Sequence, residues 1–439
     1  MRTLRVGFGG CDITPPVGLP LGGYGARLSP ADGILDPLFC RAVVFDDGRA
    51  PIALVVLDLV HVSASWVARV RGRMAELFGL RPERVLVTAT HTHAGPGVFR
   101  SVIGSHHCMM AYEDDLILKV GDCLTAAFHA AMPAVLARGR AHSVGVSASR
   151  RDPSLPIDNA VRVLCAHAAS GELLGVLADF ACHSTVLSAA SCSYSGDLFG
   201  AAAAAAASQL GAPVLLANGA GADVSTRFTR RDQSYAEVRR LGSLLADAIC
   251  RAVGSVTDGA PADQPGLGAA LRTVDVRWRA LPAPADAAAE LQAAQNALQA
   301  LRAQGGDPAV LRVAESRVEG AQAELWVSSV GGWHAVFGPR PPVAELQALY
   351  CGGVPLVAAP GELFSSAGNW LRRQLGEGTF VIGYANDYLG YFIPEVEARA
   401  GGYESLMAMV DPSCEADLRQ GLVAVAHRAM GASQPIADG

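Results

Sequence analysis

The chain carries little charge and has no basic tract. Only 17% of its 439 residues are Asp, Glu, Lys or Arg, and the formal net charge is −6. The densest basic stretch is "RFTRRD" around Arg230, which is too short to follow a phosphate backbone. Lys119 is the only lysine, and the many Ala, Gly and Arg residues are typical of a GC-rich bacterial source. We therefore expect no nucleic-acid partner.

Long apolar runs and closely spaced cysteines are also missing. No window reaches the roughly 18 to 20 uninterrupted apolar residues of a membrane-spanning helix. The first residues, "MRTLRVGFGGCDITPP", contain no apolar stretch of signal-peptide length. The ten cysteines are scattered without a C-x-x-C pair, which is typical of buried thiols in a reducing compartment. These absences predict a soluble, cytoplasmic protein with no stable membrane insertion.

Apolar runs of strand length alternate with helical patterns, which predicts an α/β fold. The run "PIALVVLDLV" (51–60) is a predicted buried strand, "SWVARVRGRMAELFGL" is a predicted helix, and "RVLVTAT" is the next strand. This β-α-β unit delivers His91 at the carboxyl end of a strand, where ligands of open α/β sheets gather. We expect a mixed open sheet flanked by helices, with strands near 160–167, 172–182, 212–218 and 269–281 and helices from 197, at 234–254 and at 412–430.

The composition changes between residues 283 and 328. Two helical patterns there are separated by Gly-Gly-Asp-Pro, and the α/β pattern resumes at about 344. We therefore expect residues 1–439 to form a single domain that contains an inserted two-helix hairpin at 283–328. Three roles stay open for the hairpin: covering the site, self-association, or approach to a membrane.

Polar side chains follow several of the predicted strands. The segment "TATHTHAGPG" contains His91 and His93, which share one face of an extended chain and could hold a metal, move a proton or end a strand. His183 follows the apolar run "LADFAC", and Glu362 opens a helix in "LVAAPGELF". Taken singly, these are compatible with a loop histidine and with a carboxylate that the helix dipole favours. Tyr388 and Tyr391 lie in the segment "NDYLGYF". Taken singly, each is compatible with a half-buried packing aromatic.

Taken in order, these segments resemble the catalytic domain of the neutral (non-lysosomal) ceramidase family. The resemblance begins with "VGFGGCDITPP" and "LGGYG", continues through "LDPLFCRAVVF" and "VVLDLVHVS", and is sharpest at "THTHAGPG". It resumes at "FACHSTVL", "NGAGADVS", "PGELFSSAGNWLRR", "YANDYLGYFIP" and "GGYES", and so spans about residue 5 to about residue 410.

The resemblance implies one zinc ion per chain. Its ligands would be His91, His183, Glu362 and Tyr391. Two imidazoles and a carboxylate are a common zinc-hydrolase donor set, and a phenolate is a plausible fourth ligand whose pKa the cation would lower.

The implied activity is hydrolysis of the amide of an N-acyl lipid amine, such as a ceramide-like substrate, through a zinc-activated water. His93 would carry a proton beside the metal or donate to the transition state, and Tyr388 would stabilise the oxyanion. Ser225 of "ADVS" matches a residue that is either nucleophile or substrate contact, and we favour contact. Arg151 is the expected pocket arginine, with the neighbouring Arg150 as the alternative.

Several departures from the family pattern leave the substrate open. The usual "GDVSPN" is "ADVSTR" here, and Ser184 follows the second histidine. The sequence also shows no signal peptide and no C-terminal immunoglobulin-like module, which is expected of a short relative with a substrate other than membrane ceramide. Alternatives are a zinc-dependent amidase, acyltransferase or amide-forming cyclase that acts on a natural-product or acyl-peptide intermediate.

Two other classes of function are less favoured. A serine hydrolase based on Ser225 lacks the G-x-S-x-G elbow, since the segment is "NGAGADVST". A non-catalytic binding protein would not require the complete set of metal and catalytic residues. A homo-oligomer is compatible with the sequence.

Overall fold

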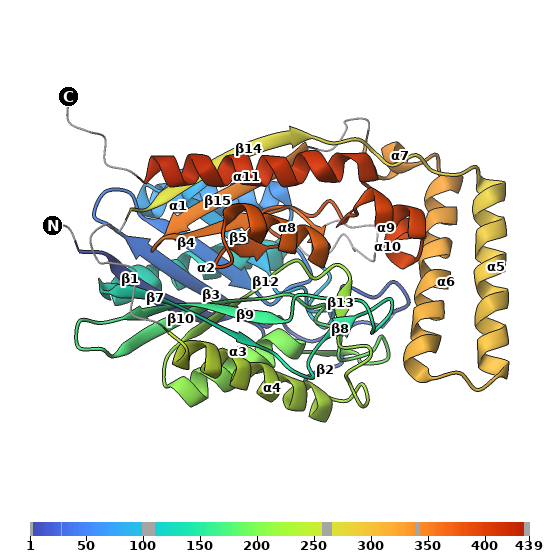
Figure 1. Ribbon diagram of the computed structural model, residues 1–439, viewed down its shortest axis with the longest axis horizontal. Coiled ribbons are helices and arrows are strands. Elements are labelled where there is room, and N and C mark those ends of the chain that lie inside the picture. The colour runs from blue at the N-terminus through green and yellow to red at the C-terminus, as the bar shows by residue number, and fades with distance from the viewer. Residues whose placement is uncertain (1–2, 28, 99–109, 257–265, 339–342, 434–439) are drawn as a thin grey trace.

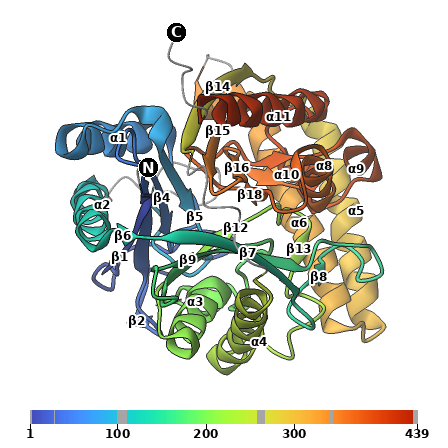
Figure 2. The ribbon, with the colours of Figure 1, turned by 60° about the vertical axis from the view of Figure 1, so that its left-hand side comes forward.

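The computed structural model describes residues 3–27, 29–98, 110–256, 266–338 and 343–433. Within these residues the long strands form three sheets rather than one open sheet, and helices cover them (Figure 1; Figure 2). The predicted mixed α/β class is confirmed. The division into three sheets was not predictable from apolar runs, because strand pairing joins segments that are distant in sequence.

The first sheet has the strand order β5-β4-β3-β1-β6. Its strands are β1 (Arg5–Asp12), β3 (Phe39–Asp46), β4 (Ile52–Leu57), β5 (Val85–Ala89) and β6 (Met132–Pro133). Helix α1 (Ala64–Phe78) connects β4 to β5, and these two strands are parallel. The helix begins at Ser63, whose side chain accepts a hydrogen bond from the backbone N–H of Trp66. The predicted β-α-β unit is therefore present, and His91 follows β5 directly.

The second sheet has the order β12-β10-β9-β7 and lies on α3 and α4 (Figure 2). Its strands are β7 (Val135–His142), β9 (Ala160–His167), β10 (Leu173–Phe180) and β12 (Val214–Asn218). The helices are α3 (Asp197–Leu210) and α4 (Tyr235–Gly254). The third sheet has the order β14-β15-β16-β18 under α11 (Glu415–Ala432). Its strands are β14 (Gly268–Asp275), β15 (Val343–Cys351), β16 (Val354–Ala358) and β18 (Phe380–Ile382).

The three sheets share one apolar core. Buried side chains from each sheet meet in the same cluster, among them Leu54, Leu177 and Leu356. In each sheet one parallel pair is present, namely β4 with β5, β10 with β12, and β16 with β18. The segments that leave β5, β10 and β16 carry the histidines and the glutamate expected from the sequence.

The shorter elements lie mostly around these strand ends. They are β2 (Gly33–Ile34), β8 (Ala148–Ser149), β11 (Ser193–Tyr194), β13 (Val224–Ser225), β17 (Glu362–Leu363) and β19 (Tyr391–Phe392). Apart from the two long helices of the next paragraph, the remaining helices of the described chain are α2 (Met110–Ala130), α7 (Trp333–Phe337), α8 (Ser365–Leu375), α9 (Glu395–Ala400) and α10 (Tyr403–Met407), with 3₁₀ turns at Pro82–Arg84 and Pro412–Cys414.

Two long helices occupy the range in which helical patterns were expected at 283–328. Helices α5 (Pro284–Ala303) and α6 (Pro308–Ser329) lie side by side at one end of the molecule, and α6 packs against α10 (Figure 1). The side chain of Asp307 caps the start of α6 by accepting hydrogen bonds from the N–H groups of Ala309 and Val310. Helix α6 is therefore the member of the pair that contacts the rest of the protein near α10.

Nine cysteines are free in the described residues, and Cys108 lies outside them. Six of the nine are buried, in agreement with the expectation of buried thiols. Across the described part of the chain, no helix combines the length and apolarity needed to cross a membrane.

Candidate metal centre and active-site pocket

The four expected metal ligands come together from separate strand ends. His91 follows β5, His183 follows β10, and Glu362 and Tyr391 are paired residues on the short parallel strands β17 and β19. His183 also forms a backbone bridge with Ser225 of β13. All five side chains are almost fully buried. The arrangement explains how residues up to 300 positions apart can form one site.

The two expected ligand histidines have the same tautomer. The Nδ1 atom of His91 lies 2.7 Å from the carbonyl oxygen of Val60, and that of His183 lies 2.8 Å from the carbonyl oxygen of Gly221. A carbonyl oxygen only accepts hydrogen bonds, so both Nδ1 atoms carry the ring hydrogen and both Nε2 atoms keep a lone pair. These Nε2 atoms lie 3.8 Å and 3.1 Å from the carboxylate oxygens of Glu362. Two nitrogen donors and a carboxylate thus face one another.

Glu362 is held as a carboxylate. Burial alone would raise its pKa, but His183, His91 and Arg150 outweigh burial and hold the pKa at about 2. Its Oε1 atom accepts a hydrogen bond of 2.6 Å from the hydroxyl of Tyr388. Burial, together with the nearby Glu362 charge, raises the pKa of Tyr388 well above its ordinary value. Tyr388 therefore remains a hydrogen-bond donor.

His93 lies beside the expected ligands, with its Nε2 atom 3.1 Å from Nε2 of His91. Because Nε2 of His91 has only a lone pair, His93 must donate this contact, and its Nδ1 atom then has no hydrogen-bond partner among the described residues. Burial lowers the pKa of His91 to about 3 and lowers that of His93 well below its ordinary value, with neighbouring histidines adding to the effect on His93. Both rings are therefore neutral at physiological pH.

This donor set fits a zinc ion. Donor atoms of His91, His93 and His183 all lie within 4.8 Å of one another. A small cavity of about 60 Å³ is bordered by His91, Glu362 and Tyr391, and it exceeds the volume that one water needs. Imidazole nitrogens with converging lone pairs and an ionised carboxylate are the donors that zinc requires.

The arginine in this cluster is Arg150 and not the expected Arg151. The Arg150 guanidinium lies 2.8 Å from Nε2 of His183, donates to the hydroxyl of Tyr391 at 2.9 Å and pairs with Glu404 at 2.7 Å. Arg151 contacts Glu397 and the carbonyl oxygen of Gly401, 2.7 Å away, and makes no contact with the histidines among the described residues. Both arginines lie in the bend that follows β8 (Ala148–Ser149), and the course of the backbone there decides which of them enters the site.

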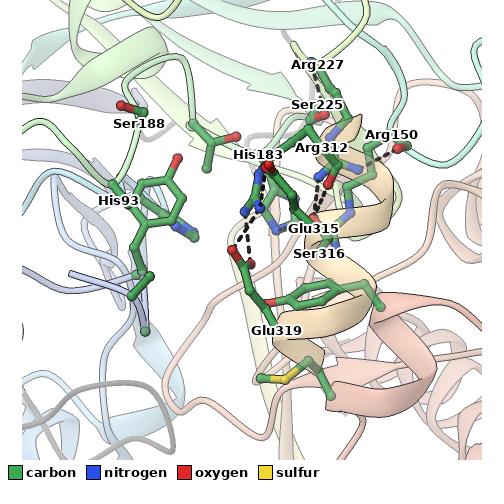
Figure 3. Close-up of a pocket in the computed structure, with 18 of the residues that line it drawn as sticks. His93, Arg150, His183, Ser188, Ser225, Arg227, Arg312, Glu315, Ser316 and Glu319 are labelled. Atoms are coloured by element: carbon green, nitrogen blue, oxygen red, sulfur yellow. Dashed lines mark hydrogen bonds and ion pairs between the residues drawn. The ribbon is translucent and has the colours of Figure 1, made fainter. Parts of the chain in front are cut away.

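A larger cavity of about 600 Å³ opens onto the cluster (Figure 3). Its wall includes His93, His183, Arg150, Ser225 and Tyr391. The Oγ atom of Ser225 accepts a hydrogen bond of 3.2 Å from the backbone N–H of Arg227, and no histidine ring is hydrogen-bonded to it in the described structure. This geometry supports a substrate contact at Ser225 rather than an activated nucleophile.

Two site residues were not identified from the sequence. Tyr384 stacks on His91 with ring centroids 4.1 Å apart, and both residues have positive φ angles of 53° and 63°. His61 packs against Tyr388 with centroids 4.8 Å apart and borders the small cavity. Positive φ costs a non-glycine residue about 1 to 3 kcal/mol and is often found at functional sites. His61 could have been found by its position after the strand at 51–60, and Tyr384 by its place at the start of the segment "YANDYLGYFIP".

A second group of possible metal ligands lies away from this site. The Sγ atoms of Cys11 (β1), Cys40 (β3) and Cys123 (α2) all lie within 4.8 Å of one another. Hydrogen bonds from Cys123 and Cys40 lower the pKa of Cys11 to about 4. Thiolates bind soft and borderline metals, so these residues must be considered in any measurement of metal content.

Comparison with known proteins confirms the resemblance seen in the sequence. Residues 4–143 match the family model for neutral/alkaline non-lysosomal ceramidase, N-terminal. A stretch of 101 residues is 39% identical to the neutral ceramidase of Mycobacterium tuberculosis (strain ATCC 25618 / H37Rv), and it covers 21% of this chain and 16% of that protein.

The whole fold is similar to that of solved ceramidase structures. The neutral ceramidase from Pseudomonas aeruginosa matches with a TM-score of 0.74 and 22% identity over 98% of this chain and 75% of that one. A structure of a ceramidase complexed with C2 matches with a TM-score of 0.73 and 21% identity over 100% and 77% of the two chains. At these identities the similarity establishes the fold.

Proposed function

Because residues 4–143 match the neutral/alkaline ceramidase family and the chain has the corresponding fold, we propose that this protein is a zinc-dependent amidohydrolase. Its substrate is an N-acyl amine, a class that includes ceramide-like lipids, and the scissile bond is a linear amide. One observation carries the proposal: the Nε2 lone pairs of His91 and His183 and the ionised carboxylate of Glu362 face one another at the walls of two neighbouring cavities.

His91, His183, Glu362 and Tyr391 are the residues that would hold the metal. When bound, zinc would polarise the amide carbonyl and lower the pKa of a water molecule. The carbonyl contacts of Val60 and Gly221 fix the orientation of the two histidine rings and would make them better ligands. Arg150 donates to the hydroxyl of Tyr391 and would position it, whereas its contact with Nε2 of His183 would give way to the metal.

The residues around this centre would manage protons and charge. His93 is neutral and borders both cavities, so it can accept a proton from the attacking water and return it to the departing amine nitrogen. Tyr388 keeps its hydroxyl proton and can donate a hydrogen bond to the carbonyl oxygen as negative charge develops there. Ser225 would contact the substrate from the wall of the larger cavity.

Release of dodecanoic acid tests the proposal. The zinc-supplied protein is incubated with N-dodecanoyl-sphingosine and N-dodecanoyl-ethanolamine, beside the variants His93→Ala and Tyr388→Phe. We expect hydrolysis by the wild type, a fall in kcat of about 10² to 10⁴ for His93→Ala, and about 10² to 10³ for Tyr388→Phe. Tyr350→Phe, on β15 and outside both cavities, is the matched control. Equal rates in wild type and His93→Ala would rule out the assigned role of His93.

A further inference from the structure

The larger cavity has a charged wall that the metal centre does not explain. Helix α6 lines this wall with Arg312, Glu315, Ser316 and Glu319, which lie across the cavity from His93 (Figure 3). The segment that follows β13 adds Arg227 and Arg230 to the wall. Four arginines and two glutamates are among the residues that border the cavity.

The acidic side chains of this wall already have cationic partners. Glu319 accepts two hydrogen bonds from Arg312, at 2.8 Å and 2.9 Å. Glu315 pairs with Arg302 at 2.9 Å and lies 3.7 Å from Arg312. Arg150, the deepest arginine of the cavity, pairs with Glu404 as described above. The carboxylates of Glu315 and Glu319 are therefore paired with Arg302 and Arg312.

Arg227 and Arg230 have no carboxylate within 4.0 Å in the described part of the chain. Arg227 donates to the carbonyl oxygen of Arg150 at 2.8 Å and to the hydroxyl of Ser316 at 3.1 Å. Arg230 donates to the carbonyl oxygen of Thr185 at 2.8 Å. These neutral partners orient the guanidinium groups but do not compensate their charge. Burial and then the charges of Arg150 and Arg312 lower the pKa of Arg227 to about 9, and the Glu404 charge only partly opposes them.

The two arginines are connected to the residues of the metal centre. Arg227 lies two positions after Ser225, and its backbone N–H donates to the Ser225 hydroxyl. The partner of Arg230, Thr185, lies two positions after His183 and also borders the cavity. A substrate group that contacts both arginines is therefore close in the fold to an amide bound at the histidines. Two half-buried guanidinium groups with no carboxylate within 4.0 Å in the described residues would bind a carboxylate or phosphate by charge-assisted hydrogen bonds.

We propose that Arg227 and Arg230 form an anion subsite and that the physiological substrate is an N-acyl amine with a carboxylate or phosphate a few bonds from the amide. N-acyl amino acids belong to this class. The proposal rests on the proposed amidohydrolase function and narrows its substrate. Helix α6 contributes to the subsite because Ser316 holds Arg227 in place.

Three matched probes test the subsite with the zinc-supplied full chain. They are N-dodecanoylglycine, N-dodecanoyl-ethanolamine and the phosphate ester of the latter, which differ mainly in the charged group. We measure kcat/KM for hydrolysis and, separately, probe affinity by titration calorimetry. The variants are Arg227→Gln, Arg227→Lys and Arg230→Gln, and Arg239→Gln on the exposed face of α4 is the control.

We expect the wild type to favour at least one acidic probe over the neutral one by about 10-fold or more in kcat/KM and in affinity. Each Gln variant should reduce that ratio by about 10- to 100-fold, Arg227→Lys should keep part of it, and Arg239→Gln should keep all of it. The probe with the larger ratio distinguishes a carboxylate substrate from a phosphate substrate. If thermal melting shows that Arg227→Gln is unfolded, Arg230→Gln decides the test.

The two proposals fail in different ways. Hydrolysis of all three probes at similar rates, with ratios unchanged in the arginine variants, would overturn the anion subsite and leave the amidohydrolase standing. No hydrolysis of any probe, combined with arginine-dependent binding of the acidic probes, would overturn the amidohydrolase and leave the subsite standing. No acidic preference in either rate or affinity overturns the subsite whatever the activity.

Discussion

At the residue scale, Arg150 and Arg151 are neighbours in the chain, yet only Arg150 contacts the histidine cluster. Where a site residue follows the end of a strand, as His91 and His183 do, the sequence predicted correctly that it meets the others at the site. It did not distinguish Arg150 from Arg151, because the direction of a side chain depends on a backbone register that one sequence does not contain. Tyr384 was missed for a related reason, since its contact with His91 depends on a positive φ angle.

The buried position of Arg150 predicts a large loss of stability on its removal. In Arg150→Gln, the buried Glu404 loses its partner at 2.7 Å and keeps only Arg151 at 3.7 Å, which costs up to about 3 to 5 kcal/mol. Arg151→Gln should cost at most about 1 kcal/mol, because its pair with Glu397 is partly exposed. Urea unfolding of both variants measures the difference, and similar values for the two would contradict the placement of Arg150.

At the scale of elements, apolar periodicity predicted most helices and strands but not how they associate. The runs that became β4, β5, β9, β10 and β12 are short and fully or largely buried, so their strand character is local information. The three-sheet arrangement and the contact of α6 with α10 depend on pairings between distant segments. The site lies where these associations bring strand ends and α6 together.

The contact between α6 and α10 predicts a substitution that acts on the pocket from a distance. A Cβ atom at Gly320 would lie 3.0 Å from Cβ of Leu406, so Gly320→Leu must push α6 away from α10. Such overpacking costs about 1 to 3 kcal/mol and would displace the cavity wall that Arg312 and Ser316 form. We expect KM to rise by more than kcat falls.

Ala293→Leu on an exposed face of α5 is the control for this prediction. Steady-state kinetics and thermal unfolding of both variants provide the comparison. If Gly320→Leu leaves both KM and melting temperature unchanged, α6 does not shape the pocket in the way inferred from its packing.

At the scale of the whole molecule, three sheets share one core and the site occupies the junction of their strand ends. This position buries several ionisable side chains that a surface site would leave hydrated. Burial lowers the pKa of His61 to about 4 and that of His91 to about 3, whereas an unfolded chain titrates its histidines near 6.5. The location of the site is therefore linked to the stability of the protein.

This linkage predicts that the metal-free protein loses stability in mild acid. Between about pH 6.5 and pH 4 the unfolded chain binds protons that the buried histidines of the folded chain do not bind. The contribution of these histidines to the free energy of unfolding is fully present above about pH 6.5. As the pH is lowered below that value, it falls by up to about 1.4 kcal/mol per pH unit for each such histidine. Urea unfolding with a chelator at about pH 7.5, 6 and 5 measures the slope.

His61→Phe should reduce the dependence of the unfolding free energy on pH by the contribution of one buried histidine. His142→Gln, at an exposed position, should leave that dependence unchanged. Because buried carboxyls such as Asp36, whose pKa burial raises to about 6, contribute a slope of the opposite sign, the comparison with His61→Phe decides the test. Equal slopes for the wild type and His61→Phe would show that His61 is hydrated or charged in the folded protein.

The central claim, a metal centre of His91, His183, Glu362 and Tyr391, is tested most directly by metal content. Wild type, His183→Ala, Glu362→Ala and Cys11→Ser are purified without added zinc, then offered one equivalent, and analysed by mass spectrometry. We predict about one zinc per chain in wild type and in Cys11→Ser, and its loss in His183→Ala and Glu362→Ala. Absence of zinc from the wild type would contradict the account. Loss of zinc only in Cys11→Ser would also contradict it and would assign the bound metal to the thiol cluster.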